Sequence, residues 1–245
     1  MTSDREIARR SLACLDLTNL DDRCTRDDVV RLCERASTPF GHVAAVCVWP
    51  RFVATAAECL AGLEVGIATV VNFPSGDEPL GDVIDMTRAS LADGATEIDL
   101  VLPYSSFVRG DTARASECVS TVRGAVPASR HLKVILETGE IGDVALIESA
   151  ARLAIAAGAD FLKTSTGKTK TSATPDAVRA MLGVIRSTAA PVGIKPSGGI
   201  RTIDDARVYL DLADEIMGPT WATPHSFRFG ASGLLDAVLA TLGVT

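Results

Sequence analysis

Short apolar runs alternate with amphipathic segments along this chain, from about residue 40 onward, and no long linker interrupts them. Short apolar runs are typical of buried strands, and segments with a 3.6-residue period are typical of helices. Strands that alternate with helices form a parallel sheet covered by helices. Aromatic residues make up only 4% of the chain, so aliphatic side chains must fill the core, which suits parallel strands. The pattern therefore predicts an α/β fold.

The alternation predicts eight strands with helices between them. Eight such units over about 200 residues fit a closed eight-stranded parallel β/α barrel, the TIM barrel. An open doubly wound sheet is the rival fold, but the Gly-x-Gly-x-x-Gly fingerprint after its first strand is missing. The predicted strands lie at residues 44–48, 67–71, 97–102, 132–137, 161–163, 192–195, 215–217 and 227–229, with helices at 53–62, 80–94, 111–125, 143–158, 174–188, 203–212 and 232–241.

We expect one domain over residues 1–245, because barrels of this kind reach this length as a single unit. The first forty residues are polar and helical in pattern, with Asp27 and Asp28 ahead of the apolar positions in 29–36. They are predicted to form a short N-terminal helical extension, about residues 1–40, of the barrel domain.

Charge and composition exclude several functional classes. The formal net charge of −7 argues against a general nucleic-acid or anionic-membrane binder. No apolar run reaches the roughly 18 residues that a membrane helix needs, and the N-terminus lacks the apolar core of a signal peptide. The six cysteines are scattered, without a CxxC pair or a His/Cys cluster at metal spacing. We therefore expect a cytoplasmic protein with reduced thiols, without a metal or other cofactor and without a nucleic-acid or membrane partner.

Two lysines stand at the ends of apolar runs. Lys163 lies in GADFLKTSTGK (158–168) and Lys195 in VGIKPSGGIR (192–201). Burying an ammonium on a strand is costly, and an amine kept there usually has a lowered pKa that suits a nucleophile or a base. Two neighbouring amines would also lower the pKa of each other. The pair indicates an enzyme that forms a Schiff base with a phosphorylated carbonyl compound.

Six chemically reactive side chains fall at or near the C-terminal ends of six successive predicted strands. In a barrel these ends meet on one face, where the active sites of this fold are built. A single polar strand residue is explained equally well by an internal hydrogen bond or ion pair, but six in succession favour a site. The six are Cys47, Asn72, Asp99, Glu137, Lys163 and Lys195.

The carboxylate of Asp99 is the candidate proton carrier. Asp99 and Glu97 share one face of their strand, and a buried aspartate near two lysines can relay protons; a purely structural salt bridge is the alternative. We expect Cys47 to line the substrate pocket and Glu137 to have a supporting role, such as pairing with a lysine. Lys133 is expected at the opposite end of the barrel or at its rim.

Three short segments are suited to a single phosphate group. They combine hydroxyls, flexible glycines and a helix N-terminus, whose amides attract anions; the loops after strands seven and eight of such barrels often bind phosphate. Because Arg and Lys are sparse beside the last two segments, backbone amides are expected to make most of the contact. The candidate residues are Thr166, Gly167 and Lys168, then Gly198 and Gly199, then Ser232 and Gly233.

These stretches together resemble the deoxyribose-phosphate aldolase family. The similarity lies in EIDLV (97–101), LKVILETG (132–139), the two lysine segments and FRFGASGLL (227–235), and it covers nearly the whole chain. Asp16 and Thr18, in DLT (16–18), also resemble the family's substrate-contact segment.

The resemblance implies a metal-free class I aldolase on a TIM barrel, active in deoxyribose phosphate catabolism. Such an enzyme reversibly cleaves 2-deoxy-D-ribose 5-phosphate to D-glyceraldehyde 3-phosphate and acetaldehyde. Lys163 would be the Schiff-base lysine, with Lys195 and Asp99 as the proton-transfer pair, and a homodimer is the family-like expectation. Other phosphosugar-barrel enzymes, such as isomerases or thiazole-forming synthases, and a non-catalytic sugar-phosphate binder are the alternatives.

One feature departs from the family pattern. Some members end in a flexible tail whose tyrosine assists proton transfer, whereas this sequence ends in LGVT (242–245) and its tyrosines are Tyr104 and Tyr209. We therefore expect enamine protonation to depend on Asp99, Lys195 and water, at a lower rate.

Overall fold

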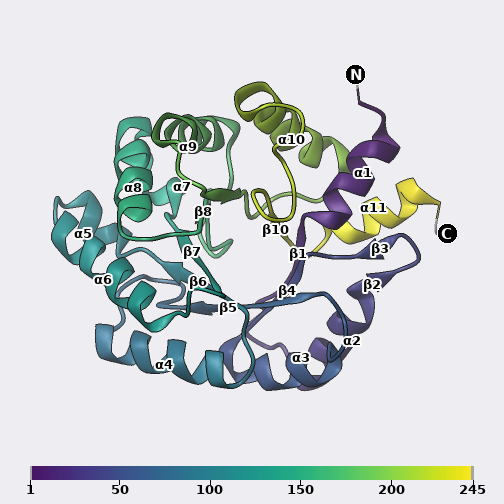
Figure 1. The fold of residues 1–245 in the computed structure, drawn as a ribbon, viewed down its shortest axis with the longest axis horizontal. Coiled ribbons are helices and arrows are strands. Elements are labelled where there is room, and N and C mark those ends of the chain that lie inside the picture. The colour runs from purple at the N-terminus through teal and green to yellow at the C-terminus, as the bar shows by residue number, and fades with distance from the viewer. Residues whose placement is uncertain (1, 244–245) are drawn as a thin grey trace.

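Eight parallel strands form the centre of the structure, a computed structural model that describes residues 2–243. The last two residues, which the expectation about a tail includes, lie outside this range. The sheet order is β10-β1-β4-β5-β6-β7-β8-β9, with helices around it (Figure 1). The strands are β1 (Leu15–Asn19), β4 (Ala45–Val48), β5 (Gly66–Val71), β6 (Glu97–Val101), β7 (His131–Ile135), β8 (Phe161–Lys163), β9 (Gly193–Lys195) and β10 (Phe229–Ala231).

The sheet closes on itself between β9 and the segment that contains β10. Single parallel bridges join Ile194 to Phe227 and Ser197 to Gly230. The amide of Ile194 donates to the carbonyl oxygen of Ser226 at 2.9 Å, and the amide of Arg228 donates back to that of Ile194 at 2.9 Å. The predicted TIM barrel is therefore confirmed, and the open doubly wound sheet is excluded.

The outer helices follow the predicted pattern, and polar caps define several of their ends. The Thr174 hydroxyl accepts from the amide of Ala177 at the start of α9, where Pro175 occupies the first position. The helices are α1 (Asp4–Ala13), α2 (Arg26–Arg35), α3 (Val53–Cys59), α4 (Leu80–Ala92), α5 (Tyr104–Val108), α6 (Thr112–Ala125), α7 (Thr138–Ile141), α8 (Val144–Ala156), α9 (Pro175–Thr188), α10 (Ile203–Met217) and α11 (Leu234–Leu242), with a 3-10 turn at Pro50–Phe52 and a small hairpin of β2 (Ser37–Thr38) and β3 (Gly41–His42).

Three elements differ from the prediction. The first forty residues contain helices α1 and α2, as expected. Between them lies β1, the first barrel strand, which was not predicted because the polar Asp16 and Thr18 interrupt its apolar residues. The predicted strand at 215–217 is the last turn of α10, which Gly218 ends with a φ of +102°. The eighth strand is therefore β10, two residues later than the predicted 227–229.

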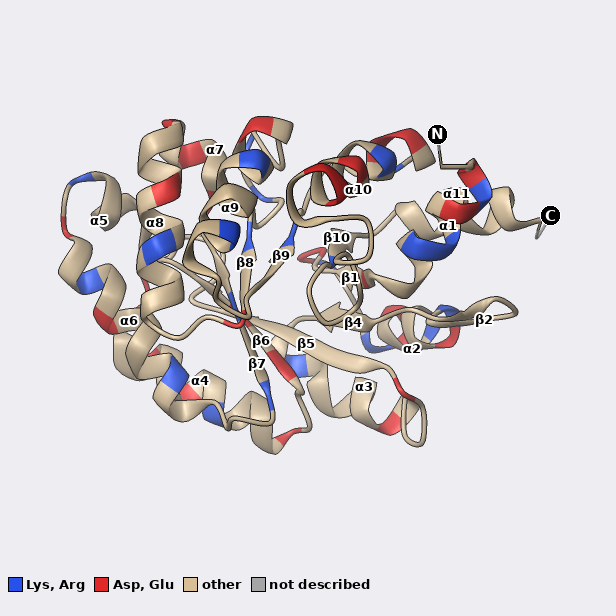
Figure 2. Cartoon of the chain, turned by 45° about the horizontal axis from the view of Figure 1, so that its top comes forward, with Lys and Arg blue, Asp and Glu red and all other residues tan. Residues whose placement is uncertain are grey.

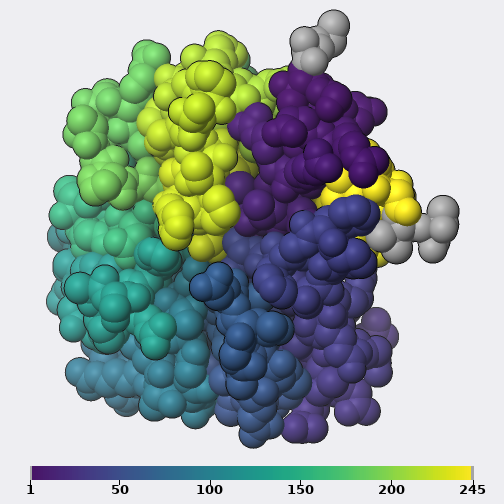
Figure 3. Space-filling model, turned by 45° about the vertical axis from the view of Figure 1, so that its right-hand side comes forward, coloured from purple at the N-terminus to yellow at the C-terminus, as the bar shows by residue number. Residues whose placement is uncertain are grey.

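Helix α1 packs against α10 and α11, so the two ends of the chain lie side by side. The Arg10 guanidinium makes a two-pronged ion pair with Asp214 of α10, with its shorter contact at 2.6 Å. In the space-filling view the purple N-terminal segment lies directly against the yellow C-terminal segment (Figure 3).

Side chains on each strand alternate between two apolar regions. The larger core lies between strands and helices and includes Leu15, Leu17 and Leu100. A smaller cluster fills part of the barrel interior, since its strand members alternate with residues of the larger core. Its buried members are Leu20, Cys47, Ala68, Val70, Phe73, Val101 and Ile135. Within residues 2–243, none of the helices has the length and hydrophobicity that spanning a membrane requires.

Truncating Leu17 tests whether β1 is a barrel strand. Leu17 is fully buried in the larger core, so Leu17→Ala should lower the free energy of unfolding by about 2–5 kcal/mol. Leu63, which is 41% exposed, provides a matched control, and Leu63→Ala should change stability by less than about 0.5 kcal/mol. Urea denaturation measures both; equal, small effects would place 15–19 outside the core.

Candidate active site

The carboxylate of Asp99 lies at the centre of the barrel and contacts three lysines. Its Oδ2 is 2.8 Å from Lys163 Nζ and 2.8 Å from Lys195 Nζ, and its Oδ1 is 3.0 Å from Lys133 Nζ. The parallel register explains the convergence, because Lys163 pairs with Lys195 and Asp99 with Lys133. Figure 2 shows blue segments, which mark Lys or Arg, and red segments, which mark Asp or Glu, on the central strands.

Lys195 is held as an ammonium ion. Burial acts to lower its pKa, but the carboxylates of Asp16, 2.5 Å away, and Asp99 raise it above its ordinary value. The expectation that a second lysine would lower the pKa of Lys195 was therefore wrong, because two carboxylates outweigh one amine.

The three carboxylates of this cluster are held ionised. Burial alone would raise the pKa of Asp99, but Lys133, Lys163 and Lys195 bring it well below its usual range. The pKa of Glu97 is also lowered against the effect of burial, by Lys133 and Arg228. That of Asp16 is lowered by Lys133, Lys195 and Arg228.

Lys133 belongs to the site, and its expected position at the far end or rim was wrong. It is fully buried, and its ammonium contacts Glu97 as well as Asp99. Strand alternation could have revealed it, because Leu132 and Val134 face the outer core and leave Lys133 facing inward.

Arg228 was also missed by the sequence interpretation. Its Nη1 is 2.6 Å from Asp16 Oδ1, and its Nη2 is 3.0 Å from Glu97 Oε1. The available signal was a charged residue between two phenylalanines, Phe227 and Phe229, both of which face the outer core. Asp16 therefore lies within a charged cluster.

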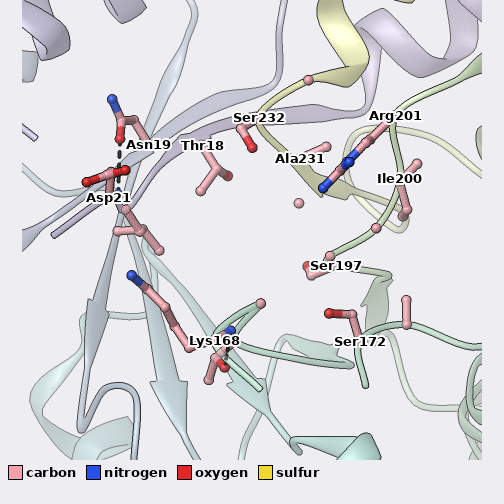
Figure 4. Close-up of a pocket in the computed structure, with 18 of the residues that line it drawn as sticks. Thr18, Asn19, Asp21, Lys168, Ser172, Ser197, Ile200, Arg201, Ala231 and Ser232 are labelled. Carbon is pink, nitrogen blue, oxygen red and sulfur yellow. Dashed lines mark hydrogen bonds between the residues drawn. The ribbon is translucent and has the colours of Figure 1, made fainter. Parts of the chain in front are cut away.

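A cavity of about 1200 Å³ opens above this cluster. Lys163 lines it, whereas Lys195, Asp99 and Asp16 are not among its lining residues. Figure 4 shows side chains from several loops around the open space. The predicted substrate-binding residues that line it are Thr18, Thr166, Gly167, Lys168, Gly198, Gly199, Ser232 and Gly233; Cys47 does not.

The Gly198-Gly199 turn exposes backbone to the cavity. Both residues are left-handed, with φ of +85° and +80°, a conformation that favours glycine. A Cβ on Gly198 would meet Ser172 Oγ at 2.4 Å, whereas a Cβ on Gly199 would enter open space. Arg201 also lines the cavity and directs its guanidinium into it (Figure 4). Arg201, two residues after Gly199, therefore adds one side-chain cation to a wall where backbone amides are expected to make most of the phosphate contact, and that expectation stays a prediction.

Glu137 holds the loop that follows β8. It is left-handed, with φ +55°, and its Oε2 accepts from the amide of Thr166 at 3.1 Å and from its hydroxyl at 2.5 Å. Thr169 Oγ1 donates to Oε1 at 3.3 Å. Burial raises the pKa of Glu137. Its hydrogen-bond partners are therefore threonines of the 166–169 loop, where a lysine was expected.

The other predicted residues lie around the site. Asn72 Nδ2 donates to the carbonyl oxygen of Val101 at 2.9 Å, Asn72 Oδ1 accepts from the amide of Glu78 at 2.8 Å, and Asn72 does not line the large cavity. Cys47 lies in the small apolar cluster, where burial raises the pKa of its thiol. Lys168 stands at the rim, 2.8 Å from an Asp22 oxygen. Among residues 2–243, no group of three or more His, Cys, Asp or Glu is placed to hold a metal ion.

Comparisons with known proteins identify relatives over nearly the full length. A family model described as "DeoC/LacD family aldolase" matches residues 10–236. The deoxyribose-phosphate aldolase of Agrobacterium fabrum is 53% identical over 239 residues, which cover 97% of this chain and 92% of that protein.

Two solved structures share the architecture. A candidate deoxyribose-phosphate aldolase from Toxoplasma gondii ME49, in its apo form, is 27% identical, with a TM-score of 0.89 over 98% of this chain and 96% of that chain. The tetrameric deoxyribose phosphate aldolase from Aeropyrum pernix is 26% identical, with a TM-score of 0.77 over 100% of this chain and 94% of that chain.

Removing the Lys195 ammonium should destabilise the protein in a pH-dependent way. Lys195→Met removes a cationic partner from both Asp16 and Asp99. We expect the free energy of unfolding to fall by about 3–5 kcal/mol at pH 7. The loss should shrink as pH falls, because the stability that comes from lowered carboxylate pKa values is fully present above the unfolded value of about 3.9 and is lost progressively as pH falls from there through the lower folded-state pKa.

Urea denaturation at pH 7 and near pH 3.5 measures this difference. Lys168→Met is the matched control, since the Asp22 partner of Lys168 is largely exposed, and it should cost less than about 1 kcal/mol at either pH. A loss for Lys195→Met that is the same at both pH values would contradict the assignment of its charge.

Proposed function

Because the chain belongs to the DeoC/LacD aldolase family, it is an aldolase, and we propose that it cleaves 2-deoxy-D-ribose 5-phosphate reversibly to D-glyceraldehyde 3-phosphate and acetaldehyde. The observation that carries the proposal is the shared contact of Lys163 and Lys195 with one Asp99 oxygen, 2.8 Å from each amine. A nucleophilic amine beside a carboxylate and an ammonium is what Schiff-base cleavage of a sugar needs.

Lys163 is the proposed nucleophile because it lines the cavity, whereas Lys195 is fully buried beneath it. Its amine attacks C1 of the open-chain sugar, and loss of water gives a protonated imine. The C2–C3 bond then breaks as the imine accepts its electron pair, and a base removes the proton of the C3 hydroxyl.

Asp99 and Lys195 are the proposed proton-transfer pair. After glyceraldehyde 3-phosphate leaves, the enamine is protonated at C2, and water hydrolyses the imine to release acetaldehyde. The Asp99 carboxylate stabilises the protonated imine through its contact with Lys163 Nζ, and the Lys195 ammonium holds that carboxylate from the other side. Because the protonated imine itself accepts the electron pair of the C2–C3 bond, the proposed mechanism needs no metal or other cofactor.

The phosphate is proposed to bind at the wall formed by Gly198, Gly199, Ser232 and Gly233, with Arg201 directed at it. Exposed backbone at the glycine turn and the N-terminus of α11 suit an anion, and Arg201 supplies a planar fork of donors. Binding energy from this remote group positions C1 against Lys163.

The remaining assignments concern the protein as a whole. We propose that residues 1–245 act as a single domain, that the protein works in the cytoplasm in deoxyribose phosphate catabolism, and that it forms a homodimer. Asp16 and Thr18 are proposed to support substrate binding. Asp16 does so through its 2.5 Å contact with Lys195, and Thr18 does so as part of the cavity wall.

Replacing Lys163 by Leu should abolish both cleavage and covalent trapping. The imine requires this amine, so borohydride and acetaldehyde should modify wild-type protein at Lys163 and leave the folded variant unmodified. Mass spectrometry locates the adduct, and cleavage is assayed in excess chelator by detecting both aldehydes. Near-normal turnover of Lys163→Leu, or a wild-type adduct on another residue, would contradict the assignment.

Replacing Arg201 by Met should weaken binding of the phosphorylated substrate without affecting the amine chemistry. We expect KM for deoxyribose 5-phosphate to rise by about 10–100-fold, the effect of losing a charge-assisted contact of about 1.5–3 kcal/mol. Trapping by acetaldehyde, which has no phosphate, should remain unchanged. Arg186→Met, far from the lining residues, is the control, and an unchanged KM for Arg201→Met would place the phosphate elsewhere.

A further inference from the structure

Six buried charged side chains form a closed ring in which positive and negative groups alternate. Three cations face three carboxylates, so the ring as a whole is neutral. No member is more than 4% exposed. In order, the ring runs Lys133, Asp99, Lys195, Asp16, Arg228, Glu97 and back to Lys133.

The contacts around the ring are short. Asp99 contacts Lys133 at 3.0 Å and Lys195 at 2.8 Å, and Lys195 contacts Asp16 at 2.5 Å. Arg228 then joins Asp16 at 2.6 Å to Glu97 at 3.0 Å. Glu97 completes the ring through its ion pair with Lys133.

Lys163 contacts this ring through Asp99 Oδ2, at 2.8 Å, and lines the cavity. The net charge of the ring therefore acts on the amine that meets substrate. Because the ring is neutral, an ammonium at Lys163 shares the Asp99 carboxylate with Lys133 and Lys195 and adds one net positive charge to the buried cluster, and excess buried charge is costly.

We propose that Glu97 and Arg228 are positioning residues that keep the ring neutral and thereby set the pH range in which Lys163 forms its imine. This inference rests on the proposed aldolase function. Neither residue lines the cavity; Glu97 acts through Lys133 and Arg228 through Asp16.

Other charged or titratable groups also face the site. Lys195 contacts the same Asp99 oxygen as Lys163. The charge of Lys163 also acts to lower the pKa values of Glu137 and Cys47. His131 Nδ1 lies 3.5 Å from Glu97 Oε1. These groups are the same in every variant below, so a difference between variants reports the charge of the ring.

The test measures how trapping of acetaldehyde at Lys163 by cyanoborohydride depends on pH. Arg228→Met leaves the ring one unit negative, so Lys163 should keep its proton to higher pH and the midpoint of trapping should rise by about one pH unit. Glu97→Gln leaves the ring one unit positive, and the midpoint should fall by about as much. A loss of packing alone would lower the yield without moving the two midpoints in opposite directions.

Three controls isolate charge from structure. Arg228→Lys keeps the charge and should keep the wild-type midpoint. The double variant E97Q/R228M is neutral again and should return close to the wild-type midpoint. Arg179→Met and Glu215→Gln make the same substitutions in a surface ion pair of 2.8 Å and should have no effect.

The outcomes separate this inference from the proposed function. Midpoints that stay in place, or that move in the same direction for the two single variants, would overturn the role of the ring. If Arg228→Met does not fold, a midpoint of Glu97→Gln that fails to fall would overturn it equally. Wild-type protein that is never trapped would instead contradict the aldolase proposal.

Discussion

The Asp99 carboxylate makes it possible to bury three lysines inside one barrel. Each ammonium would be costly to desolvate alone, and removing one partner from such a cluster leaves an uncompensated charge. Asp99 contacts Lys133, Lys163 and Lys195 at 2.8–3.0 Å. With Asp16 and Glu97 it balances Lys133, Lys195 and Arg228, so a protonated Lys163 is the net charge of the cluster. The arrangement gives the interior few low-energy alternatives, because moving any member separates two opposite charges. The buried charged cluster therefore forms a base of the cavity with little freedom to rearrange.

The barrel interior is divided between two kinds of surface. Strands β4 to β7 contribute the small apolar cluster, with Cys47, Val70 and Ile135 among its buried members. The cavity wall beside β8, β9 and β10 carries hydroxyls, glycines and Arg201. Lys163 stands where the polar wall meets the charged floor. Of the buried members of the apolar cluster, Leu20 is the one that lines the cavity, so a substrate bound there meets mainly hydroxyls, glycine backbone and Arg201.

The sequence was sufficient for the fold class and for the residues that bring chemistry to strand ends. Lys163, Lys195 and Asp99 were identified because a charged residue interrupts an apolar run where parallel strands converge. Lys133 was placed at the wrong end of the barrel and Arg228 was missed, because Lys133 stands ahead of the C-terminal end of β7 and Arg228 just before β10, so neither follows the strand-end pattern used to find the site. The wrong strand at 215–217 and the hidden β1 have a related cause, since local hydrophobicity does not reveal which segments a closed barrel will pair.

The closure of the barrel has a consequence for biosynthesis. β1 pairs with β10, Leu15 opposite Phe229, and the ion pair of Asp16 with Arg228 joins residues 212 positions apart. During translation, the N-terminal member of each pair is synthesised early and the C-terminal member near the end of the chain. Contacts of such long sequence separation form slowly. The charged cluster at the base of the cavity is therefore among the last parts of the molecule to be assembled, and a nascent chain that ends before Arg228 lacks the cation that pairs with Asp16 and Glu97.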